Sequence, residues 1–229
     1  MNMQRIGGWA AIVEAAAYGF GIAVAFSALA AYMGGTLDPN ETVAFIVDHD
    51  SLLYVWNTVI YLLFGVALVV LVIALHQRLE GAAPGLVNTA TAFGLVWAGL
   101  VLASGMIFNV GMDVVIDLHA AGDSGAASTW IAISAVQDGL GGGNELVGGV
   151  WTLLVSWAAL RAKVLPRGLN GLGMIAGVAG IVTILPGAAS LGIVFGLGQL
   201  VWFVWLGVVM IRSGVATAGR RPSVEARAA

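Results

Sequence analysis

Long apolar runs decide what this chain can fold into. A helix needs roughly 20 apolar residues to cross a hydrocarbon layer of about 30 Å. Six segments qualify as spans, of which the fourth and fifth are short and rich in glycine: Gly8 to Met33, Leu52 to Leu75, Leu86 to Val110, Leu146 to Leu160, Leu169 to Leu185 and Leu191 to Ile211. The sequence therefore predicts an all-α integral membrane bundle of about six transmembrane helices.

Two further segments fall outside these spans. Residues 126–136 are apolar, but the segment is only about eleven residues long, which favours an interfacial or re-entrant segment over a full span. From Gly214 onward the chain is polar and basic, so residues 214–229 are expected to form a disordered cytoplasmic tail that can touch anionic lipid. Residues 1–213 are then a single transmembrane domain.

Charge segregation predicts the orientation of the bundle. Short cytoplasmic loops of membrane proteins carry an excess of Lys and Arg. With the N-terminus inside, all nine basic residues fall on the cytoplasmic side, and nine of the twelve acids fall outside. We therefore expect a plasma-membrane protein with both termini in the cytoplasm. The first span has a small-residue stretch near Ala28 that resembles a cleavage site, but its length and Glu14 favour a retained span.

Composition excludes several classes of function. Charged residues make up 9% and hydrophobic residues 60% of the chain, whereas a soluble domain has about a quarter charged residues. The chain has no cysteine, so disulfides, thiolate metal sites and iron–sulfur clusters are excluded. No basic stripe with interleaved aromatics indicates nucleic-acid binding. His49 and His119 lie near carboxylates, but their spacing is not diagnostic, so we expect neither a metal nor a cofactor.

Glycine is abundant, at 33 residues, and recurs at helical spacing, as in Gly148 and Gly149, Gly173 and Gly177, and Gly192 and Gly196. Small residues let helices approach closely in lipid, where packing and dispersion replace the hydrophobic effect as the driving force. The pattern predicts tight packing within the bundle. Homo-oligomerisation through the same glycine-rich faces is the alternative.

The stretch Leu165-Pro-Arg-Gly-Leu-Asn-Gly-Leu-Gly173 carries a family resemblance. A span that ends in a basic turn, then Leu-Pro-Arg, then a glycine- and leucine-rich span resembles a widespread bacterial membrane-protein family known only as a domain of unknown function. The segments Gln4-Arg-Ile-Gly-Gly-Trp9 and Ala74-Leu-His-Gln-Arg-Leu79 are similar to its first two helices. The resemblance implies a compact multi-helix bundle and implies no activity. Pro166 itself cannot continue a helix, so it indicates a tight turn.

The polar end of the third span is the first candidate site. Asn109, Asp113 and Asp117 are four residues apart, so they share one face if the helix runs that far, and His119 follows. A straight helix from Leu86 places Asp113 about 40 Å along its axis, at or beyond the outer membrane boundary. The residues are therefore either a solvated helix end or part of an outward-facing site.

Glu145 is the second candidate, because it follows the helix-breaking run Gly141-Gly-Gly-Asn144 and opens the fourth span. Unwound backbone at membrane depth is tolerated where protein buries it or where it lines a cavity. A carboxylate is also favoured simply by the dipole at a helix N-terminus. If Asp113, Asp117, His119, Asp138 and Glu145 converge, they form an acidic outer pocket that can bind a cation, donate a proton or attract water.

Glu14 is the most isolated acid, because it lies within the first span. Its candidate partners are Tyr18 one turn further on, Asn57, Tyr61 and Asn88, none of which is basic. An acid inside the membrane is by default a functional hypothesis. Glu14 is therefore either a hydrogen-bonded structural acid near the inner interface or a proton-handling group.

Three tryptophans are expected deep in the bundle, namely Trp97, Trp151 and Trp202. Buried aromatic residues usually contribute packing. The alternative is an apolar cavity whose aromatic faces stabilise a cationic ligand or intermediate.

Three functions remain open from the sequence. The first is a membrane protein that binds or passes a small molecule, a lipid or a cation through an acidic outward-facing pocket. The second is an intramembrane acid catalyst that acts on an isoprenoid or other lipid, similar in size and aromatic content to small membrane-bound terpene cyclases. The third is a structural or accessory subunit. The expected partners are membrane lipids and a small apolar or cationic ligand.

Overall fold

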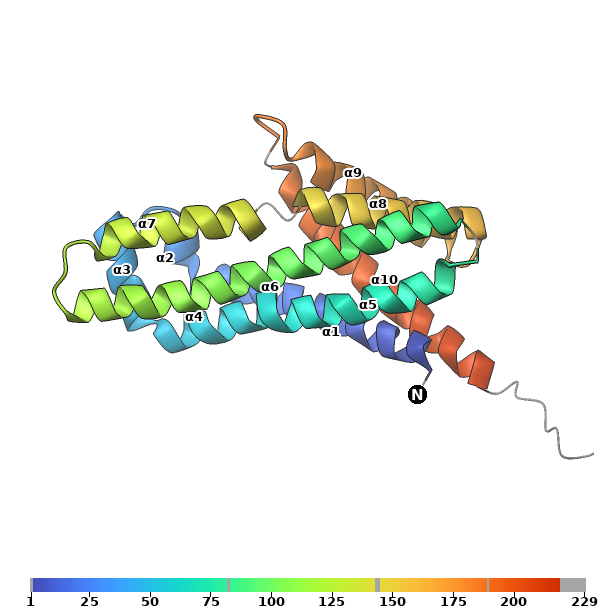
Figure 1. Ribbon diagram of the computed structural model, residues 1–229, viewed down its shortest axis with the longest axis horizontal. Helices are drawn as coiled ribbons and strands as arrows, with labels where there is room; N and C mark the ends of the chain where they lie inside the picture. The colour runs from blue at the N-terminus through green and yellow to red at the C-terminus, as the bar shows by residue number, and fades with distance from the viewer. Residues whose placement is uncertain (1, 82, 143–144, 189, 219–229) are drawn as a thin grey trace, which may run out of the picture.

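Helices make up all the regular structure in the described residues, which are 2–81, 83–142, 145–188 and 190–218 of this computed structural model. Figure 1 shows an elongated bundle along which α6 (Pro84–Ala120) runs from one end to the other. At a rise of 1.5 Å per residue its 37 residues extend about 55 Å, well beyond a hydrocarbon layer of about 30 Å. α6 is therefore too long to lie within such a layer along its whole length, and the other helices form two halves along it.

The half of the molecule that contains the helix ends with the basic residues is named the inner half, and the other the outer half, after the orientation that the sequence predicts. The inner half consists of the first part of α6 and five other helices, α1 (Met3–Ala25), α5 (Phe64–Leu79), α8 (Glu145–Ala162), α9 (Arg167–Val182) and α10 (Leu191–Ala218). Its apolar core is one large cluster that includes Leu68, Leu71, Trp97, Trp202 and Phe203. The disordered tail was predicted to begin at Gly214, but α10 continues to Ala218, and residues 219–229 lie outside the described residues.

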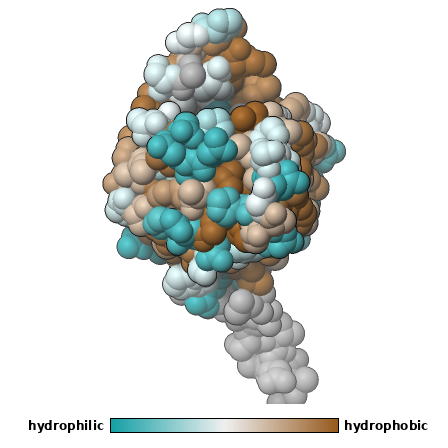
Figure 2. All heavy atoms as spheres, turned by 90° about the vertical axis from the view of Figure 1, so that its left-hand side faces the viewer, coloured by the Kyte–Doolittle hydropathy of each residue, from teal (hydrophilic) through white to brown (hydrophobic). Residues whose placement is uncertain are grey.

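The outer half is built around the last turns of α6. It contains α2 (Ala30–Met33), α3 (Pro39–Asp48), α4 (Asp50–Asn57) and α7 (Ala126–Gln137), and it has its own apolar cluster. The first turn of α3 is fixed by a capping box between Asp38 and Glu41. Figure 2 looks onto this end of the molecule and shows hydrophilic side chains interspersed with apolar ones.

α7 and α8 lie one after the other along α6 (Figure 1). The π-helical turn η2 (Asp138–Gly142) extends α7 towards α8, and residues 143–144 of the predicted glycine break lie outside the described residues. The segment predicted to be interfacial or re-entrant is thus a 12-residue helix that packs against α3 and α6.

Two predicted spans differ in length from the helices observed. The first was expected to reach Met33, but α1 ends at Ala25, and Phe26 and Ser27 form turns before α2. The third was expected to end near Val110, but α6 continues to Ala120. α6 can continue because Met112 and Val115 are fully buried on one face while its polar residues are exposed.

Four described helical segments are long and apolar enough to cross a membrane: Met3–Ala25, Asp50–Leu79, Pro84–Ala120 and Leu191–Ser213. The second of these is continuous through α4, the π-helical segment η1 (Thr58–Leu63) and α5. Arg167–Val182 is a shorter apolar helix. The protein is therefore an all-helical membrane protein.

Glycine produces the closest helix contact, which is between α8 and α9. A Cβ atom added to Gly149 would lie 2.6 Å from the carbonyl oxygen of Gly177, and one added to Gly177 would lie 2.7 Å from that of Gly149. Both contacts are with backbone atoms, which cannot shift without moving the helix. These two glycines pack within the bundle, as their sequence spacing predicts.

Arg78 joins three parts of the inner end. Its guanidinium donates hydrogen bonds to Gln4 Oε1 and Ser213 Oγ, each at 3.0 Å, and to the Val164 carbonyl oxygen at 3.1 Å. These acceptors belong to α1, α10 and the turn between α8 and α9. Arg78 therefore fixes the relative positions of the helix ends that surround the core.

Candidate functional site

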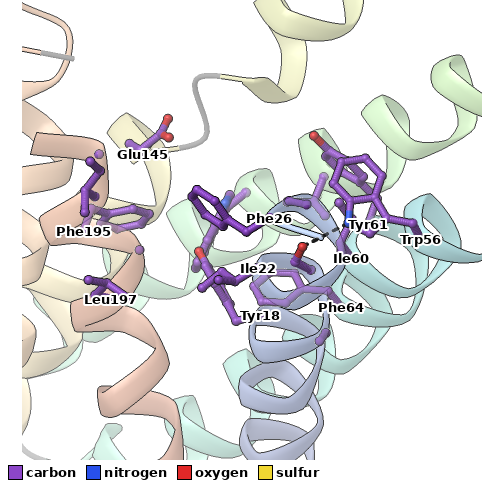
Figure 3. A pocket seen from close by; sticks show the side chains of 18 residues that line it. Tyr18, Ile22, Phe26, Trp56, Ile60, Tyr61, Phe64, Glu145, Phe195 and Leu197 are labelled. Atoms are coloured by element: carbon purple, nitrogen blue, oxygen red, sulfur yellow. Dashed lines mark hydrogen bonds between the residues drawn. The ribbon is translucent and has the colours of Figure 1, made fainter. Parts of the chain in front are cut away.

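A cavity of about 580 Å³ lies where the two halves of the molecule meet. It is bounded by the end of α1, the end of α4 with η1, the middle of α6, the start of α8 and the start of α10. Three of these boundaries are helix ends, so the cavity exists because α1, α8 and α10 do not extend into the outer half. Figure 3 shows the lining side chains.

A series of aromatic rings in mutual contact forms one part of the wall. The ring centroids of Tyr18 and Phe64 are 5.5 Å apart, those of Phe64 and Trp97 are 5.7 Å apart, and those of Trp97 and Phe195 are 6.4 Å apart. The first two pairs meet edge to face, which is a favourable arrangement for aromatic quadrupoles. Trp97 is 1% exposed, so the base of the wall belongs to the packed core. The wall is therefore rigid and already formed.

η1 supplies another side of the cavity. A π-helical turn inserts one extra residue into a helix and often marks a functional site. Here it directs Ile60 and Tyr61 towards the cavity, as Figure 3 shows. The Tyr61 hydroxyl accepts a hydrogen bond from Gln137 Nε2 at 3.1 Å, which links this wall to α7. Next to it, Trp56 Nε1 donates to the Gly21 carbonyl oxygen at 3.2 Å.

Exposed apolar side chains lie at the mouth of the cavity. Phe26 at the end of α1 is 85% exposed, and Ile193 and Leu197 of α10 are 67% and 52% exposed. All three also line the cavity. The exposed edge of the cavity is therefore apolar.

Among the described residues that line the cavity, Glu145 is the only acid. It is the first residue of α8, where the helix dipole favours a negative group. A Cβ atom added to Gly192 of α10 would lie 3.6 Å from Glu145 Oε1, so the carboxyl group extends across to the start of α10. Its side chain is half-buried, which leaves it available to a bound molecule. Glu145 therefore provides the polar end of an otherwise aromatic cavity.

Tyr18 connects Glu145 to the second predicted acid, Glu14. Tyr18 lines the same cavity as Glu145. Glu14 lies one turn earlier on α1, is fully buried, and has no hydrogen-bond partner at either carboxyl oxygen among the described residues. The structure thus brings Glu14, Tyr18, Glu145 and Trp97 to one region.

The remaining deep tryptophans lie behind this wall. The ring centroids of Trp97 and Trp151 are 5.5 Å apart, and those of Trp151 and Trp202 are 5.7 Å apart. Trp151 and Trp202 are 1% and 0% exposed and do not line the cavity. They pack the core and support Trp97 from behind.

The polar residues at the end of α6 lie elsewhere. Asp113 is exposed and accepts a hydrogen bond from the Tyr54 hydroxyl at 2.7 Å, and Asn109 Oδ1 accepts one from Asn57 Nδ2 at 2.7 Å. Asp117 and His119 are exposed. Asp113 is twelve residues beyond Val101, the last residue of α6 that lines the cavity, or about 18 Å along the helix.

The outer acids therefore do not share a pocket with Glu145. Asp138 is also exposed and does not line the cavity. Within the described ranges, no three His, Asp or Glu side chains are grouped closely enough to hold a metal ion. The outer polar residues form a solvated rim, and the cavity is a separate feature.

Several lining residues were missed by sequence reasoning, notably Phe26, Trp56, Phe64, Phe195 and Leu197. Each is an ordinary aromatic or aliphatic residue of an apolar segment. Only the combination of a helix end, a π-helical turn and a second helix start brings them together. Tyr61 was considered only as a possible partner of Glu14.

One family model matches residues 6–209, and it is described as Domain of unknown function (DUF4386). The chain belongs to this family. The match extends from α1 to α10, so the DUF4386 domain includes every helix that bounds the cavity, and the expectation of an uncharacterised family is confirmed. No curated protein and no solved structure shows significant similarity to the chain.

Proposed function

We propose that this DUF4386 protein binds a small amphiphilic molecule, whose apolar body occupies the aromatic cavity and whose polar end is held by Glu145. The observation that carries the proposal is the combination of an aromatic, preformed cavity with a single carboxyl group at a helix N-terminus. Ligand pockets are typically mostly apolar, with a few polar groups that fix orientation. The cavity volume of about 580 Å³ is within the usual range of about 300–1,000 Å³.

The chemistry of the wall narrows the class of ligand. A carboxyl group beside aromatic faces favours a positively charged group or a hydrogen-bond donor over an anion. The Tyr18 and Tyr61 hydroxyls can accept or donate further hydrogen bonds. The exposed apolar mouth at Phe26, Ile193 and Leu197 favours a molecule that partitions into lipid. An amine- or hydroxyl-bearing lipid-like molecule fits these features best.

For the topology we propose six crossings by α1, α4 to α5, the inner part of α6, α8, α9 and α10, with both termini in the cytoplasm of the plasma membrane. α8 and α9 have 18 and 16 residues, or about 27 and 24 Å at 1.5 Å per residue, which suits slightly short spans. Support comes from the basic residues near the inner helix ends, Arg5, Arg78, Arg161, Lys163, Arg167 and Arg212. The cavity then lies towards the outer boundary.

Acid catalysis on an isoprenoid is the second candidate. Glu145 faces a wall that contains Trp97, and aromatic faces can stabilise a carbocation that a protonated carboxyl group has generated. Such intermediates need an enclosed site that excludes water. The open mouth at Phe26 therefore favours binding over catalysis.

The experiment is native mass spectrometry of what co-purifies with the protein in native nanodiscs. We compare the wild type with Glu145→Gln and with Asp113→Asn, a matched acid-to-amide change outside the cavity. The wild type and Asp113→Asn should retain the same small molecule, and Glu145→Gln should lose it or exchange it. Three identical, empty profiles would contradict the proposal and favour an accessory subunit. A ligand that appears in chemically altered form only when Glu145 is intact would favour catalysis.

A further inference from the structure

We propose that Glu14 is a second functional site, a carboxyl group in the membrane core that holds a proton and exchanges it with the cavity past Tyr18. The proposal uses the cavity but not its occupant, so it stands or fails separately from the proposed ligand.

Burial is the first step towards this inference. Glu14 is 0% exposed, and neither of its carboxyl oxygens has a hydrogen-bond partner among the described residues. An isolated carboxylate in such surroundings is far too costly, and a buried acid of this kind becomes neutral instead. Glu14 therefore carries a proton. A buried polar group without a protein partner also indicates an unseen one, such as a water molecule that enters from the cavity.

Helix register shows what surrounds the carboxyl group. A Cβ atom added to Gly7 would meet the Ala74 side chain, and one added to Gly21 would meet that of Ile60. Glu14 lies midway between the two glycines. It is seven residues, or about two helical turns, from each, so all three lie on the same face of α1. The antiparallel register therefore places it opposite Ala67 of α5, a small buried residue that leaves room for a longer side chain.

In the part of the chain that the structure describes, no charged group lies close enough to neutralise Glu14. The described helices that pack against α1 contain these ionisable residues: Tyr32 in α2, Asp50 and Tyr54 in α4, Tyr61 in η1, His76 and Arg78 in α5, and Arg212 in α10.

The basic residues among them lie at the inner end. His76 is nine residues beyond Ala67, or about 13 Å along α5, and Arg78 lies further still. Arg212 is exposed. On the other side of Glu14, the nearest ionisable groups are the cavity residues Tyr18 and Tyr61. The neutral form of the Glu14 carboxyl group is thus the stable one. The nearest polar groups to it are the tyrosines of the cavity.

Tyr18 supplies the connection. It lies one helical turn from Glu14, its ring contacts Phe64 and Phe203, and it lines the same cavity as Glu145. A hydroxyl group can accept one proton while it donates its own. Glu14 and Tyr18 are not hydrogen-bonded to each other, so a cavity water bridges them in the transfer. The Glu14 O–H bond breaks and its proton passes through this water to the Tyr18 oxygen, while the Tyr18 proton passes to a second cavity water or to the Glu145 carboxylate. A proton returns to Glu14 by the reverse route, so the carboxyl group is neutral again after the exchange. Tyr18 stays neutral throughout.

The test is infrared spectroscopy of the full chain in nanodiscs. The wild type should show a carbonyl band of a protonated carboxyl group at neutral pH, and Glu14→Gln should lose it. Transfer into D₂O should shift the band, and Tyr18→Phe should slow that shift severalfold. Tyr54→Phe is the matched control, because it removes a hydroxyl that hydrogen-bonds Asp113 outside the cavity, and it should leave the rate unchanged.

Wild-type protein gives a second measurement that needs no variant. Dicyclohexylcarbodiimide, an apolar reagent that requires a protonated carboxyl group, should modify Glu14 and leave exposed Asp113 and Asp117 unmodified in peptide mass spectra, with labelling that declines as pH rises. Absence of the protonated band together with absence of Glu14 labelling would overturn the proposal. A shift rate that Tyr18→Phe leaves unchanged would overturn the route. Neither result depends on whether Glu145→Gln loses a ligand.

Discussion

At the scale of single residues, position along the helix decides what a carboxyl group does. Asp113 is exposed at the outer end of α6 and hydrogen-bonds Tyr54, whereas Glu145 faces aromatic rings at the start of α8. Glu14 is enclosed by apolar side chains. A charge costs little free energy at Asp113, can hold a ligand at Glu145, and costs far too much free energy at Glu14. The three acids therefore have different roles despite the same chemistry.

The contact between α8 and α9 gives a prediction at this scale. Gly177→Ala introduces a methyl group 2.7 Å from the Gly149 carbonyl oxygen, so it should destabilise the protein by about 1–3 kcal/mol, as overpacking typically does. Thermal unfolding in detergent, followed by tryptophan fluorescence, measures the effect.

Gly171→Ala on the same helix is the control, because nothing lies within 4 Å of its added Cβ atom. It should be neutral or slightly stabilising, because alanine is the better helix former by about 1 kcal/mol. Equal loss of stability in both variants would contradict the packing described for Gly149 and Gly177.

At the scale of helices, interruptions create the cavity. α1 ends at Ala25, α10 begins at Leu191, and η1 interrupts the α-helical hydrogen bonding between α4 and α5. A continuous set of six helices would fill the same space with side chains. The sequence indicates one such interruption, the glycine run before Glu145. It does not indicate η1, because Thr58 to Leu63 has the composition of any apolar helix.

Arg78 gives a prediction at this scale, because it joins α1, α10 and the turn between α8 and α9. Arg78→Ala removes three hydrogen bonds from a charged donor and should lower stability by about 1.5–3 kcal/mol. Arg78→Lys should recover only part of the loss, because an ammonium group cannot reproduce the planar guanidinium fork.

The matched control is Arg167→Ala, which removes an exposed arginine at the same end and should change stability by less than about 0.5 kcal/mol. Chemical unfolding curves of all three variants provide the comparison. An Arg78→Ala protein as stable as Arg167→Ala would show that the inner helix ends hold together without this residue.

At the scale of the whole molecule, composition predicts the class well. Apolar runs identify the all-helical membrane bundle, and the match to residues 6–209 confirms the expectation of an uncharacterised family. The separation of Asp113 from Glu145 could not be predicted, because it depends on how far α6 continues past Val110. The cavity could not be predicted either, since its lining comes from five separate parts of the chain.

Topology gives a prediction at this scale, because the chain has no cysteine and every introduced cysteine is unique. With both termini inside, Ser124→Cys at the outer end should react with a membrane-impermeant maleimide on intact cells. Arg167→Cys at the inner end should react only after permeabilisation. Both residues are exposed in the structure, so burial does not protect either one. The opposite labelling pattern would reverse the proposed orientation.

Occupancy of the cavity is the central claim, and a cavity-filling substitution tests it most directly. Gly196 lines the cavity with only the Tyr18 ring within 4 Å of an added Cβ atom, so Gly196→Phe fills the space with little backbone strain. Gly99→Phe adds the same ring to an exposed face of α6 and serves as the control. In native mass spectrometry, the wild type and Gly99→Phe should carry the small molecule, and folded Gly196→Phe should be empty. An unchanged ligand in Gly196→Phe would contradict the cavity as the binding site.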